Sequence, residues 1–528
     1  MGWQKAVTAL FRKETVVPEK IIEVSYAWLA TAVLLAAVDL EIFSLLAETG
    51  PLTHLQLREK LELNPRSTPD FPDTLLAMDL LVREGDGDTA LYSNTKDGAV
   101  FLDKRREACY LGDRFKEILR LYRDWIDHPN FIRKKENKGI KLQEVTRMFK
   151  SVADFHLFKS AREGAIGNDE KDVTPDRIIE IALSFWTSRM LLTACELQVF
   201  TTIGAADKQR MNMKAIAKSL DLCSKTTTEF LDSLVTCGML KSKKIDGTLF
   251  YSNPPATAYY LDRNKEFYLG GLMEFFSAYH YAAAADMSET LRTGQSQLSA
   301  KGTELDFYSA LYPHEGAAEG LAFGLMSVMI EASVVFARTV SLKKYNTAMD
   351  IGGASGHFGA RMARHNPNLK VIVTDRAEMV PVTQKFINER WPDVKDRVTP
   401  LEHDYFKEPE FPKVDVITMT MILLQWGIDK KKILVRKAFE ALPTDGMLVC
   451  IDHFIMDDAR RKDAFGLRKS LLMYLIHGNH VDGKSGDEVG GRTFTFGEYK
   501  AWCLEAGFRK VKMVKLPGQP MPAGIAYK

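Results

Sequence analysis

The chain contains few cysteines and lacks an uninterrupted apolar run long enough to cross a membrane. Its 528 residues include only six cysteines, which are scattered and form no Cys-x-x-Cys pair. This usage predicts reduced thiols in a cytoplasmic protein and argues against a disulfide framework or a zinc site. The longest apolar stretch, at 28–38, ends at Asp39, short of the roughly 18 residues that a membrane span requires. We therefore expect no membrane partner.

An excess of charge of either sign is also missing. The 71 basic residues are matched by 69 acidic ones, which leaves a net charge of +2. Proteins that bind nucleic acid usually carry a strongly basic face, so we expect no nucleic-acid partner. Apolar residues make up 46% and charged residues 27% of the chain, a balance typical of a soluble globular protein. At roughly 100–200 residues per domain, such a chain forms about two to four domains.

What the sequence does contain is an internal repeat. Five short stretches recur in the same order further along the chain, at a spacing of 157 to 159 residues. The pairs are 21–23 and 178–180, 39–43 and 196–200, 91–94 and 250–253, 101–103 and 260–262, and 110–112 and 268–270. A few insertions or deletions of one or two residues explain the drift in spacing. We interpret the stretches as two copies of one module.

Each copy shows the pattern of a winged helix. A largely apolar helix is followed by a helix-turn-helix stretch, and Asp-Gly pairs at 86–87 and 246–247 are turn signals for a strand pair. Winged helices often bind DNA, but the second expected recognition helix, 226–238, carries Glu229 and Asp232 and no lysine or arginine. We therefore expect modules that contact protein.

From Thr347 onward the pattern changes to alternating strands and helices. The expected strands are 348–350, 371–374, 414–419 and 447–451, and the expected helices are 357–365, 431–442 and 498–506. This alternation predicts a doubly wound α/β sheet, which binds ligands at the carboxyl ends of its strands.

The first of these strands leads into a glycine-rich turn, and the second ends at a carboxylate. The turn reads Asp350-Ile-Gly-Gly-Ala-Ser-Gly356, where glycine lets the backbone approach a ligand closely. Asp375 follows Gly356 by 19 residues, a distance that suits a carboxylate accepting both hydroxyls of a ribose. A nicotinamide dinucleotide would require Gly-x-Gly-x-x-Gly, whose third glycine has no match here. With Asp404 behind them, these residues predict a different nucleoside cofactor.

Residues from about 178 to the C-terminus resemble the small-molecule O-methyltransferase family of the acetylserotonin and caffeate type. The similar stretches are 291–294, 350–356, 367–375, 403–406, 441–446, 491–508 and 524–528. The resemblance implies a winged-helix dimerisation domain followed by a Rossmann-like class I methyltransferase domain, with S-adenosylmethionine as methyl donor. The first repeat then resembles an extra copy of the dimerisation domain. The expected parts are a tail at 1–18, a first module at 19–125, a connector at 126–173, a second module with a helical substrate region at 174–340, and the methyltransferase domain at 341–528.

The resemblance also assigns roles to residues around the glycine turn. Gly352 and its neighbours would line the methionine part of the cofactor, Asp375 would hold the ribose, and Asp404 and Tyr405 would flank the adenine. A carboxylate at 404 could instead cap a turn. The expected cofactor-binding residues are Asp350, Gly352, Gly353, Gly356, Asp375, Arg376, Asp404, Tyr405 and Thr420.

The sequence departs from the family at the general base. The family carries this base in a Leu-His-Asp-Trp motif after the fourth strand, and the matching residues here are Leu423-Leu-Gln-Trp426. Leu424 therefore replaces the histidine and Gln425 the acid. Leucine cannot accept a proton, so the usual deprotonation of a phenol lacks its base.

Three explanations stay open. In the first, the acceptor needs no such base, as with a thioether acid whose sulfur becomes a sulfonium, or it is activated differently, as with an enolisable 2-oxo acid. Proximity and orientation of the reactants alone can lower the activation barrier by on the order of 7–11 kcal/mol. Alternatively, another histidine acts as base, the candidates being His280, His453, His477 and His480. In the third explanation the domain binds cofactor without catalysis, and the chain is a regulatory or interaction protein. The expected catalytic residues are His477, His480 and Gln425; this pair of histidines could also bind a metal, but we expect none.

The pattern of residues 264–340 predicts helices at 269–291, 304–311 and 315–340. The acceptor is expected between the helices of 269–330 and the mouth of the sheet. The expected substrate contacts are Tyr279, His280, Phe323, Met326, Met329 and Trp426, although methionines and aromatic residues at helical spacing equally fill a core. A small-molecule acceptor is thus the expected ligand besides the cofactor. The duplicated module predicts either a homodimer or an intrachain pseudo-dimer, in which the first copy pairs with the second.

Overall fold

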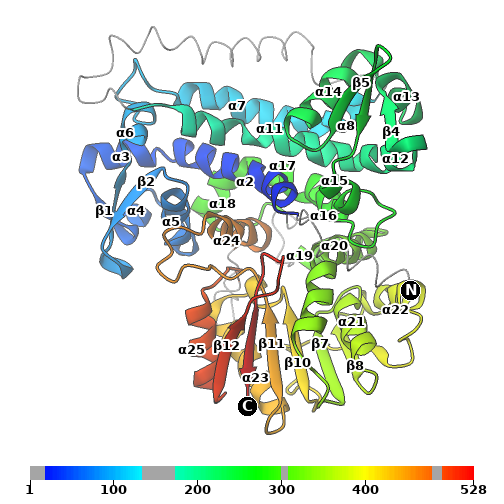
Figure 1. The fold of residues 1–528 in the computed structure, drawn as a ribbon. Helices are drawn as coiled ribbons and strands as arrows, with labels where there is room; N and C mark the ends of the chain where they lie inside the picture. Colours follow the sequence, from blue (N-terminus) through cyan, green and yellow to red (C-terminus); the bar gives the residue numbers. More distant parts are fainter. Residues whose placement is uncertain (1–17, 134–172, 299–306, 479–489) are drawn as a thin grey trace. The chain divides into compact units, whose positions relative to one another are not determined.

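A computed structural model of the protein describes residues 18–133, 173–298, 307–478 and 490–528 (Figure 1). The chain forms two compact units. The first consists of the described parts of 1–31, 114–171 and 179–282, and the second of those of 32–113, 172–178 and 283–528. The expected tail at 1–18 and connector at 126–173 lie mostly outside the described residues.

The second unit contains a seven-stranded sheet with the order β12-β13-β11-β10-β7-β8-β9. Its strands are β7 Thr347–Ile351, β8 Lys370–Asp375, β9 Val398–Glu402, β10 Val416–Thr420, β11 Met447–Ile451, β12 Lys510–Val514 and β13 Ala523–Tyr527. Strands β7 to β11 pair in parallel, whereas β13 runs antiparallel to β11 and β12. Every residue of β10 and β11 is buried, as expected for central strands covered on both faces. The predicted doubly wound α/β fold is confirmed.

Helices pack onto this sheet (Figure 1). They include α21 His357–His365, α22 Val380–Arg390 and α25 Phe496–Ala506. The same unit also contains α18 Met287–Thr293, α19 Phe307–Leu311, α20 Ala317–Thr339, α23 Ile428–Ala441 and α24 Ala464–His477. Helix α20 packs against α21 and α22, and α23 packs against α25. Gly359 in α21 permits close contact with β8, since a Cβ there would lie 3.0 Å from side-chain atoms of Val371 and Val373.

The first repeat belongs largely to the same unit. Its elements are α3 Ile42–Thr49, β1 Leu52–Thr53, α4 His54–Lys60, η1 Pro65–Ser67, α5 Asp70–Ala77, β2 Leu81–Glu84, η2 Gly87–Thr89, β3 Leu91–Asn94 and α6 Lys96–Phe101. The strands form an antiparallel sheet with the order β1-β3-β2. Two helices followed by a small antiparallel sheet are the elements of a winged helix.

The second repeat lies in the first unit and has the same order of elements. They are α12 Val199–Ala205, η5 Asp207–Gln209, β4 Arg210–Asn212, α13 Met213–Ser219, α14 Ser224–Thr236, β5 Lys241–Ile245, β6 Thr248–Ser252 and α15 Pro255–Tyr260. Its sheet has the corresponding order β4-β6-β5.

Equivalent hydrogen bonds form inside each of the two repeats. Asn94 Nδ2 donates to the carbonyl of Phe43 at 2.8 Å, and Asn253 Nδ2 donates to the carbonyl of Phe200 at the same distance. The Tyr92 hydroxyl donates to a carboxylate oxygen of Asp73 at 2.6 Å. The equivalent pair, Tyr251 and Asp232, is 2.8 Å apart. The sequence repeat therefore corresponds to a repeated tertiary structure.

The hairpins of the two repeats differ. In the second repeat, Asp246 and Gly247 both adopt positive φ, 45° and 79°, and join β5 to β6 directly, as the Asp-Gly signal predicts. In the first repeat, Asp86 and Gly87 lie in a longer loop that contains η2 and joins β2 to β3. Arg461 holds this longer loop by donating to the carbonyl of Gly85 at 2.5 Å and to the carboxylate of Asp86 at 2.7 Å.

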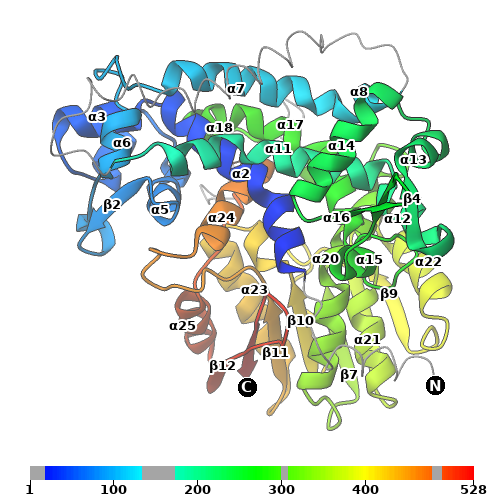
Figure 2. The ribbon, with the colours of Figure 1, turned by 45° about the horizontal axis from the view of Figure 1, so that its top comes forward.

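The first unit also contains the opening helices of both repeats. These are α2 Glu19–Asp39, of which residues 19–31 belong to this unit, and α11 Asp176–Glu196, accompanied by α7 Gly112–Asp124, η3 Trp125–Asp127 and α8 His128–Ile132. Figures 1 and 2 show α7 lying alongside α11, and the rings of Tyr122 and Phe185 are 5.4 Å apart there.

Thr31 of α2 binds the backbone of α11. Its hydroxyl donates to the carbonyl of Ile181 at 2.8 Å and accepts from the backbone N–H of Phe185 at 3.0 Å. Both bonds are buried. A hydroxyl that crosses from one helix to the backbone of another fixes the register of the pair.

Ser188 of α11 makes the same two bonds in the opposite direction. Its hydroxyl donates to the carbonyl of Val24 at 2.6 Å and accepts from the backbone N–H of Trp28 at 2.9 Å. Each of these residues stands 157 positions before or after its counterpart in the first set. The contacts are therefore reciprocal, the pattern that a two-fold axis produces between identical subunits.

The helix expected over residues 269–291 is interrupted. It consists of α16 Gly270–Phe275, a π-helical turn Phe276–His280, α17 Tyr281–Ala283, the 3₁₀ turn Ala284–Asp286 and then α18. The prediction of one continuous helix is wrong. The changes of helical pitch turn the side chains of Tyr279 and His280 away from the positions that a regular helix would give them.

Three described helices are long and apolar enough to cross a membrane by length and composition: α2, α11 and α20. In the folded protein, 67–78% of the residues in their apolar windows are buried. Much of their apolar surface thus packs inside the protein, as in the contacts between α2 and α11.

Candidate functional site

The glycine turn follows β7 at the place where the connections of the sheet change direction. From β7 the chain continues to β8 on one side, and from β10 to β11 on the other, so the crevice between β7 and β10 is the ligand site of this fold class. Gly352 and Gly356 adopt positive φ, 61° and 72°, which favours glycine. A Cβ on Gly352 would lie 2.3 Å from Ile422 Cδ1, so a larger residue would also require this side chain to move.

Asp350 is completely buried at the end of β7. One carboxylate oxygen accepts a hydrogen bond from the Thr418 hydroxyl at 2.6 Å. The other, Oδ2, accepts no bond of normal geometry from the described residues, and a Cβ on Gly353 would lie 2.7 Å from it. Burial raises the pKa of Asp350 to about 7. Above about pH 7 the carboxylate offers a negative charge beside the bare backbone of the turn.

Asp375 ends β8 and holds the turn in place. One carboxylate oxygen accepts from the backbone N–H of Ala354 at 2.9 Å, and the other from the N–H of Arg376 at 2.9 Å. The side chain is half-buried, and burial raises the pKa of this carboxyl to about 6. Each oxygen keeps a second lone pair with which it can accept a hydroxyl of a ligand.

A short helix lies close to the residues that follow Asp375. Arg376 donates to the hydroxyl of Ser309 on α19 at 2.9 Å, and its guanidinium lies 5.6 Å from the ring of Tyr312. Segment 307–312 thus contacts the residue that follows the expected ribose ligand. The sequence indicated a helix here but gave no sign of this contact.

Asp404 caps a turn in this structure. One carboxylate oxygen accepts from the backbone N–H groups of Phe406 and Lys407 at 3.1 and 3.2 Å, and the Lys407 ammonium lies 3.1 Å from the other. Two of the neighbouring rings, Tyr405 and Trp426, meet edge to face at 5.9 Å. Trp426, expected on the substrate side, therefore packs against the residues expected at the adenine.

These residues fit the expected cofactor. Gly352 and Gly356 adopt positive φ and expose backbone at the sheet edge, Asp350 offers a buried carboxylate suited to the ammonium of a methionine group, and Asp375 offers two acceptors suited to a ribose. Thr420, at the end of β10, is buried and lies on the same edge of the sheet.

The position of the missing base lies in a 3₁₀ turn, η8 Leu423–Gln425, after β10. The side chain of Leu424 is buried, and its backbone N–H donates to a carboxylate oxygen of Asp452 at 3.1 Å. Gln425 Nε2 donates to the carbonyl of Met421 at 2.6 Å, and its Oε1 accepts from the Tyr308 hydroxyl at 2.6 Å. Neither Leu424 nor Gln425 can accept a proton at neutral pH.

The candidate histidines occupy different surroundings. His477, half-buried at the end of α24, lies 6.0 Å from the ring of Tyr308, which places it near Gln425. His453 is buried beside Phe465, and burial lowers its pKa well below the usual value. His280 is buried in the first unit, and His480 lies outside the described residues. In the part of the chain that the structure describes, no three His, Cys, Asp or Glu side chains gather as a metal site would require.

The expected substrate contacts lie in both units. Tyr279 and His280 belong to the π-helical turn of the first unit, where both rings contact Phe275. On α20 of the second unit, Phe323 lies beside the guanidinium of Arg390 at 5.6 Å, while Met326 and Met329 are buried. The remaining expected contact, Trp426, follows η8.

Sequence reasoning did not identify two groups near η8. Tyr308 binds Gln425, and Asp452, at the end of β11, binds the backbone of Leu424. Burial raises the pKa of Asp452 to about 7. The useful signal for Asp452 was its position: a polar residue directly after a fully apolar central strand lies at the ligand edge of such a sheet.

Comparison with protein families gives two kinds of match. The O-methyltransferase domain matches residues 285–507, and the O-methyltransferase dimerisation domain matches twice, at residues 22–104 and 179–263. Together these matches cover most of the chain.

Individual relatives agree with these matches. The tetracenomycin polyketide synthesis 8-O-methyl transferase TcmO of Streptomyces glaucescens is 29% identical over 344 residues, which are 65% of this chain and 94% of that protein. The acetylserotonin O-methyltransferase of Macaca mulatta is 27% identical over 342 residues, 64% of this chain and 93% of that protein. An N,N-dimethyltransferase, OxyT of Streptomyces rimosus, is 26% identical over 332 residues, 63% of this chain and 90% of that protein.

Solved structures share the fold. Human N-acetylserotonin methyltransferase in complex with SAM superposes with a TM-score of 0.59 at 22% identity, over 69% of this chain and 99% of that one. PigF with SAH gives a TM-score of 0.56 at 18% identity, over 67% of this chain and all of that one.

Proposed function

This chain belongs to the S-adenosylmethionine-dependent O-methyltransferase family, and on that premise we propose that it methylates a small organic acceptor without a general base at position 424. The observation that carries the proposal is Leu424, a buried apolar side chain where the resemblance expects histidine. Its neighbour Gln425 is engaged by Tyr308 and by the carbonyl of Met421, so it too offers no base.

The identity of the acceptor atom decides whether a base is needed. Bound S-adenosylmethionine supplies a methyl group on a positively charged sulfur. The acceptor atom forms a bond to this carbon as the bond to the sulfonium breaks, and S-adenosylhomocysteine leaves as a neutral thioether. A phenol must also lose its proton, whereas a thioether attacks through a lone pair and becomes a sulfonium without any proton transfer.

We therefore propose a small thioether acid as the acceptor class. Positioning of the two reactants would then supply most of the rate acceleration, on the order of 7–11 kcal/mol for well-oriented groups. An enolisable 2-oxo acid is the second candidate, because it reacts through its enol carbon and is activated at a different atom from a phenol. A base at His477 is a further alternative, favoured by its position near Tyr308 and Gln425.

The test is release of S-adenosylhomocysteine by the full-length protein with panels of thioether acids, phenols and 2-oxo acids. Turnover of thioether acids is expected, and turnover of phenols alone would contradict the proposal. Calorimetry with S-adenosylmethionine separates enzyme from regulatory protein: we expect binding, and a chain that neither binds the cofactor nor turns over any acceptor would be a regulatory relative.

We also propose that the two dimerisation domains pair within the chain. Support comes from the reciprocal bonds of Thr31 and Ser188 between α2 and α11. Tyr122 and Tyr281, 159 positions apart, add a stacked pair of rings with centroids 4.4 Å apart and planes 5° from parallel. Reciprocal contacts between equivalent residues are what a homodimer would make between two chains.

Light scattering on the full-length protein tests this pairing. A mass of one chain across a range of concentrations is the expected result, because the pairing face is used internally. A concentration-independent mass of two chains would favour a homodimer.

We further propose a cytoplasmic location, on the support of six free thiols.

A further inference from the structure

The first dimerisation domain differs from the second where its recognition helix should begin. In the second domain this helix, α14, starts at Ser224, which corresponds to position 65 at the repeat spacing of 159. In the first domain α5 starts only at Asp70, because Pro69 forces Thr68 into an extended conformation, with φ −116° and ψ 146°. Residues 65–67 form the separate turn η1 instead.

This turn carries Arg66, which reaches the methyltransferase domain. Its Nη2 donates to the carbonyl of Gly491 at 2.7 Å and to the Ser470 hydroxyl at 3.2 Å, and its Nη1 pairs with the Asp70 carboxylate at 2.5 Å. Arg66 and Asp70 are both about 1% exposed. The guanidinium fork thus joins a carboxylate of its own domain to the backbone of the other.

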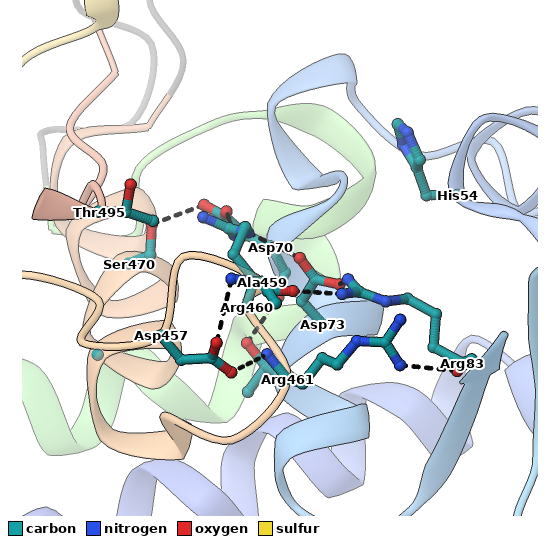
Figure 3. Close-up of polar contacts among 12 residues, drawn as sticks. His54, Asp70, Asp73, Arg83, Asp457, Ala459, Arg460, Arg461, Ser470 and Thr495 are labelled. Carbon is teal, nitrogen blue, oxygen red and sulfur yellow. Dashed lines mark hydrogen bonds and ion pairs between the residues drawn. The ribbon is translucent and has the colours of Figure 1, made fainter. Parts of the chain in front are cut away.

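Asp70 belongs to a buried network of ion pairs that crosses the same contact (Figure 3). Arg460 binds both Asp70 and Asp73, the latter at 2.8 Å, and Arg83 binds Asp73 at 2.6 Å. The Ser470 hydroxyl donates to Asp70 at 2.6 Å. Removing one member of such a network leaves a buried charge without its partner, so the contact is either complete or strongly weakened.

Segment 491–493, to which Arg66 binds, makes hydrogen bonds at three consecutive residues. Besides the bond from Arg66 to Gly491, the buried ammonium of Lys431 donates to the carbonyl of Arg492 at 2.6 Å. The backbone N–H of Thr493 donates to Ser470 at 3.2 Å. One of these three contacts, from Arg66, comes from the first dimerisation domain, and a second runs through Ser470, whose hydroxyl also binds Arg66 and Asp70.

The same segment lies against the turn that replaces the base. A Cβ on Gly491 would be 2.9 Å from the carbonyl oxygens of both Leu424 and Gln425. The backbones of 491 and η8 are therefore in direct contact. Any displacement of Gly491 changes the space beside η8, where the acceptor is expected.

The second dimerisation domain has lost this docking set. At the repeat spacing, Arg66 corresponds to Lys225 and Arg83 to Ser242. The counterparts of Asp70 and Asp73 are Glu229 and Asp232, which remain acidic but are exposed. Lysine does not reproduce the two-pronged contacts of arginine. The first domain thus carries arginines that the corresponding positions of the second domain do not repeat.

We propose that Arg66 is a positioning residue, through which the first dimerisation domain holds segment 491–493 against η8 and so shapes the acceptor side of the site. The proposal rests on the proposed methyl transfer for its kinetic consequence alone. Its structural consequence, the immobilisation of 491–493 and 423–426, is measurable without turnover.

The test compares R66K with R105K in the full-length protein by amide hydrogen exchange. Arg105 is the control because it pairs only locally, with Asp103 at 2.8 Å in the same domain, and is half-exposed. In R66K we expect the amide exchange rates of 491–493 and 423–426 to rise about tenfold over those of the unaltered protein. The rates of 350–356 should stay within about twofold of the unaltered values. R105K should leave all three segments unchanged. Unchanged exchange at 491–493 in R66K, or an equal rise at 350–356, would overturn the proposal.

Should R66K fold poorly, S470A gives the same test, since it removes the hydroxyl shared by Arg66, Asp70 and Thr493. With an acceptor in hand, R66K should raise the acceptor KM about tenfold while cofactor affinity stays within about threefold, a split that general destabilisation would not produce. The expected exchange pattern without any methyl transfer would contradict the proposed function and leave the positioning role standing.

Discussion

At the scale of single residues, the site separates into a part that fits the cofactor and the turn at Leu424, where the resemblance expects the base. Asp350, Gly352 and Asp375 form a connected unit, in which Asp375 binds the N–H of Ala354 within the turn. Leu424 lies across the crevice, on the turn after β10. The cofactor-binding residues and Leu424 can therefore be tested independently.

Replacing Leu424 by histidine should restore a base at this position. L424H is expected to methylate phenols at a rate at least about tenfold above the unaltered protein, because an imidazole contributes general-base catalysis of roughly 10²–10⁴-fold when well placed. L424N is the control, since asparagine is similar in shape but cannot accept a proton at neutral pH. Equal phenol turnover by both variants would show that position 424 does not hold a base.

Replacing Asp375 by asparagine should weaken the cofactor site. The carboxylate loses its charge and one acceptor oxygen, and a lost bond to a charged group costs about 1.5–3 kcal/mol, or roughly 10- to 150-fold in affinity. Calorimetry with S-adenosylmethionine measures this. E402Q is the control, because Glu402 lies exposed on the neighbouring strand. A D375N protein with unchanged affinity would remove Asp375 from the site.

Cofactor affinity should fall as the pH drops from about 8 to about 5.5. Burial raises the pKa of Asp350 to about 7 and that of Asp375 to about 6, so both carboxylates gain protons over this range. The free energy of unfolding changes with pH in the opposite direction. The stabilisation of the fold that comes from these raised pKa values is fully present below about pH 4 and is lost as the pH rises through 6 to 7.

Calorimetry across this range, paired with denaturant unfolding, separates the two effects. In D350N the affinity change centred near pH 7 should disappear. An affinity that is flat with pH in the unaltered protein would mean that neither carboxylate needs its charge to bind cofactor.

The sequence predicted the glycine turn and Asp375 because their roles depend on local backbone geometry and on fixed spacing. It did not predict Tyr308 beside Gln425, or Arg66 beside Gly491, because these contacts join residues 117 and 425 positions apart. Comparison of the two repeats indicates that the first copy differs around Arg66. Pro65, Pro69 and Pro72 interrupt the first copy there and have no counterpart in the second.

At the scale of elements, strands and helices with a strong local pattern were predicted well. The helix at 357–365 and the strand at 447–451 match α21 and β11. Strand β9 was missed because Pro400 interrupts its pattern; such a strand is tolerated at the sheet edge, where β9 lies. The helix at 269–291 was predicted as continuous because π and 3₁₀ turns leave little trace in apolar periodicity.

The pairing of α2 with α11 predicts a symmetric response to mutation. T31V and S188A each remove a buried hydroxyl that makes two bonds to the backbone of the other helix. Each should lower the free energy of unfolding by about 1–3 kcal/mol, by similar amounts. Denaturant unfolding of both variants measures this. T187V is the control, because Thr187 bonds only within its own helix and is exposed. A loss confined to one of the two variants would contradict the reciprocal pairing.

At the scale of the whole molecule, the duplication has produced two domains with different tasks. Both retain the internal contacts of the module, such as the Tyr-Asp pair. Arg66 and Arg83 of the first domain bind the methyltransferase domain, and the corresponding positions of the second domain carry Lys225 and Ser242. One chain thus carries two dimerisation domains and one catalytic domain, which suits a protein that pairs internally and acts as a single copy.

The central claim is that methyl transfer proceeds without a base at Leu424. It is tested most directly by the rate of S-adenosylhomocysteine release from the full-length protein, saturated with cofactor, with a thioether acid and a phenol compared at each pH from about 6 to 9. The account predicts release with the thioether acid at a rate that does not depend on pH once cofactor is bound, and little or none with the phenol. Release with the phenol alone, rising through a pKa near that of a histidine, would contradict it.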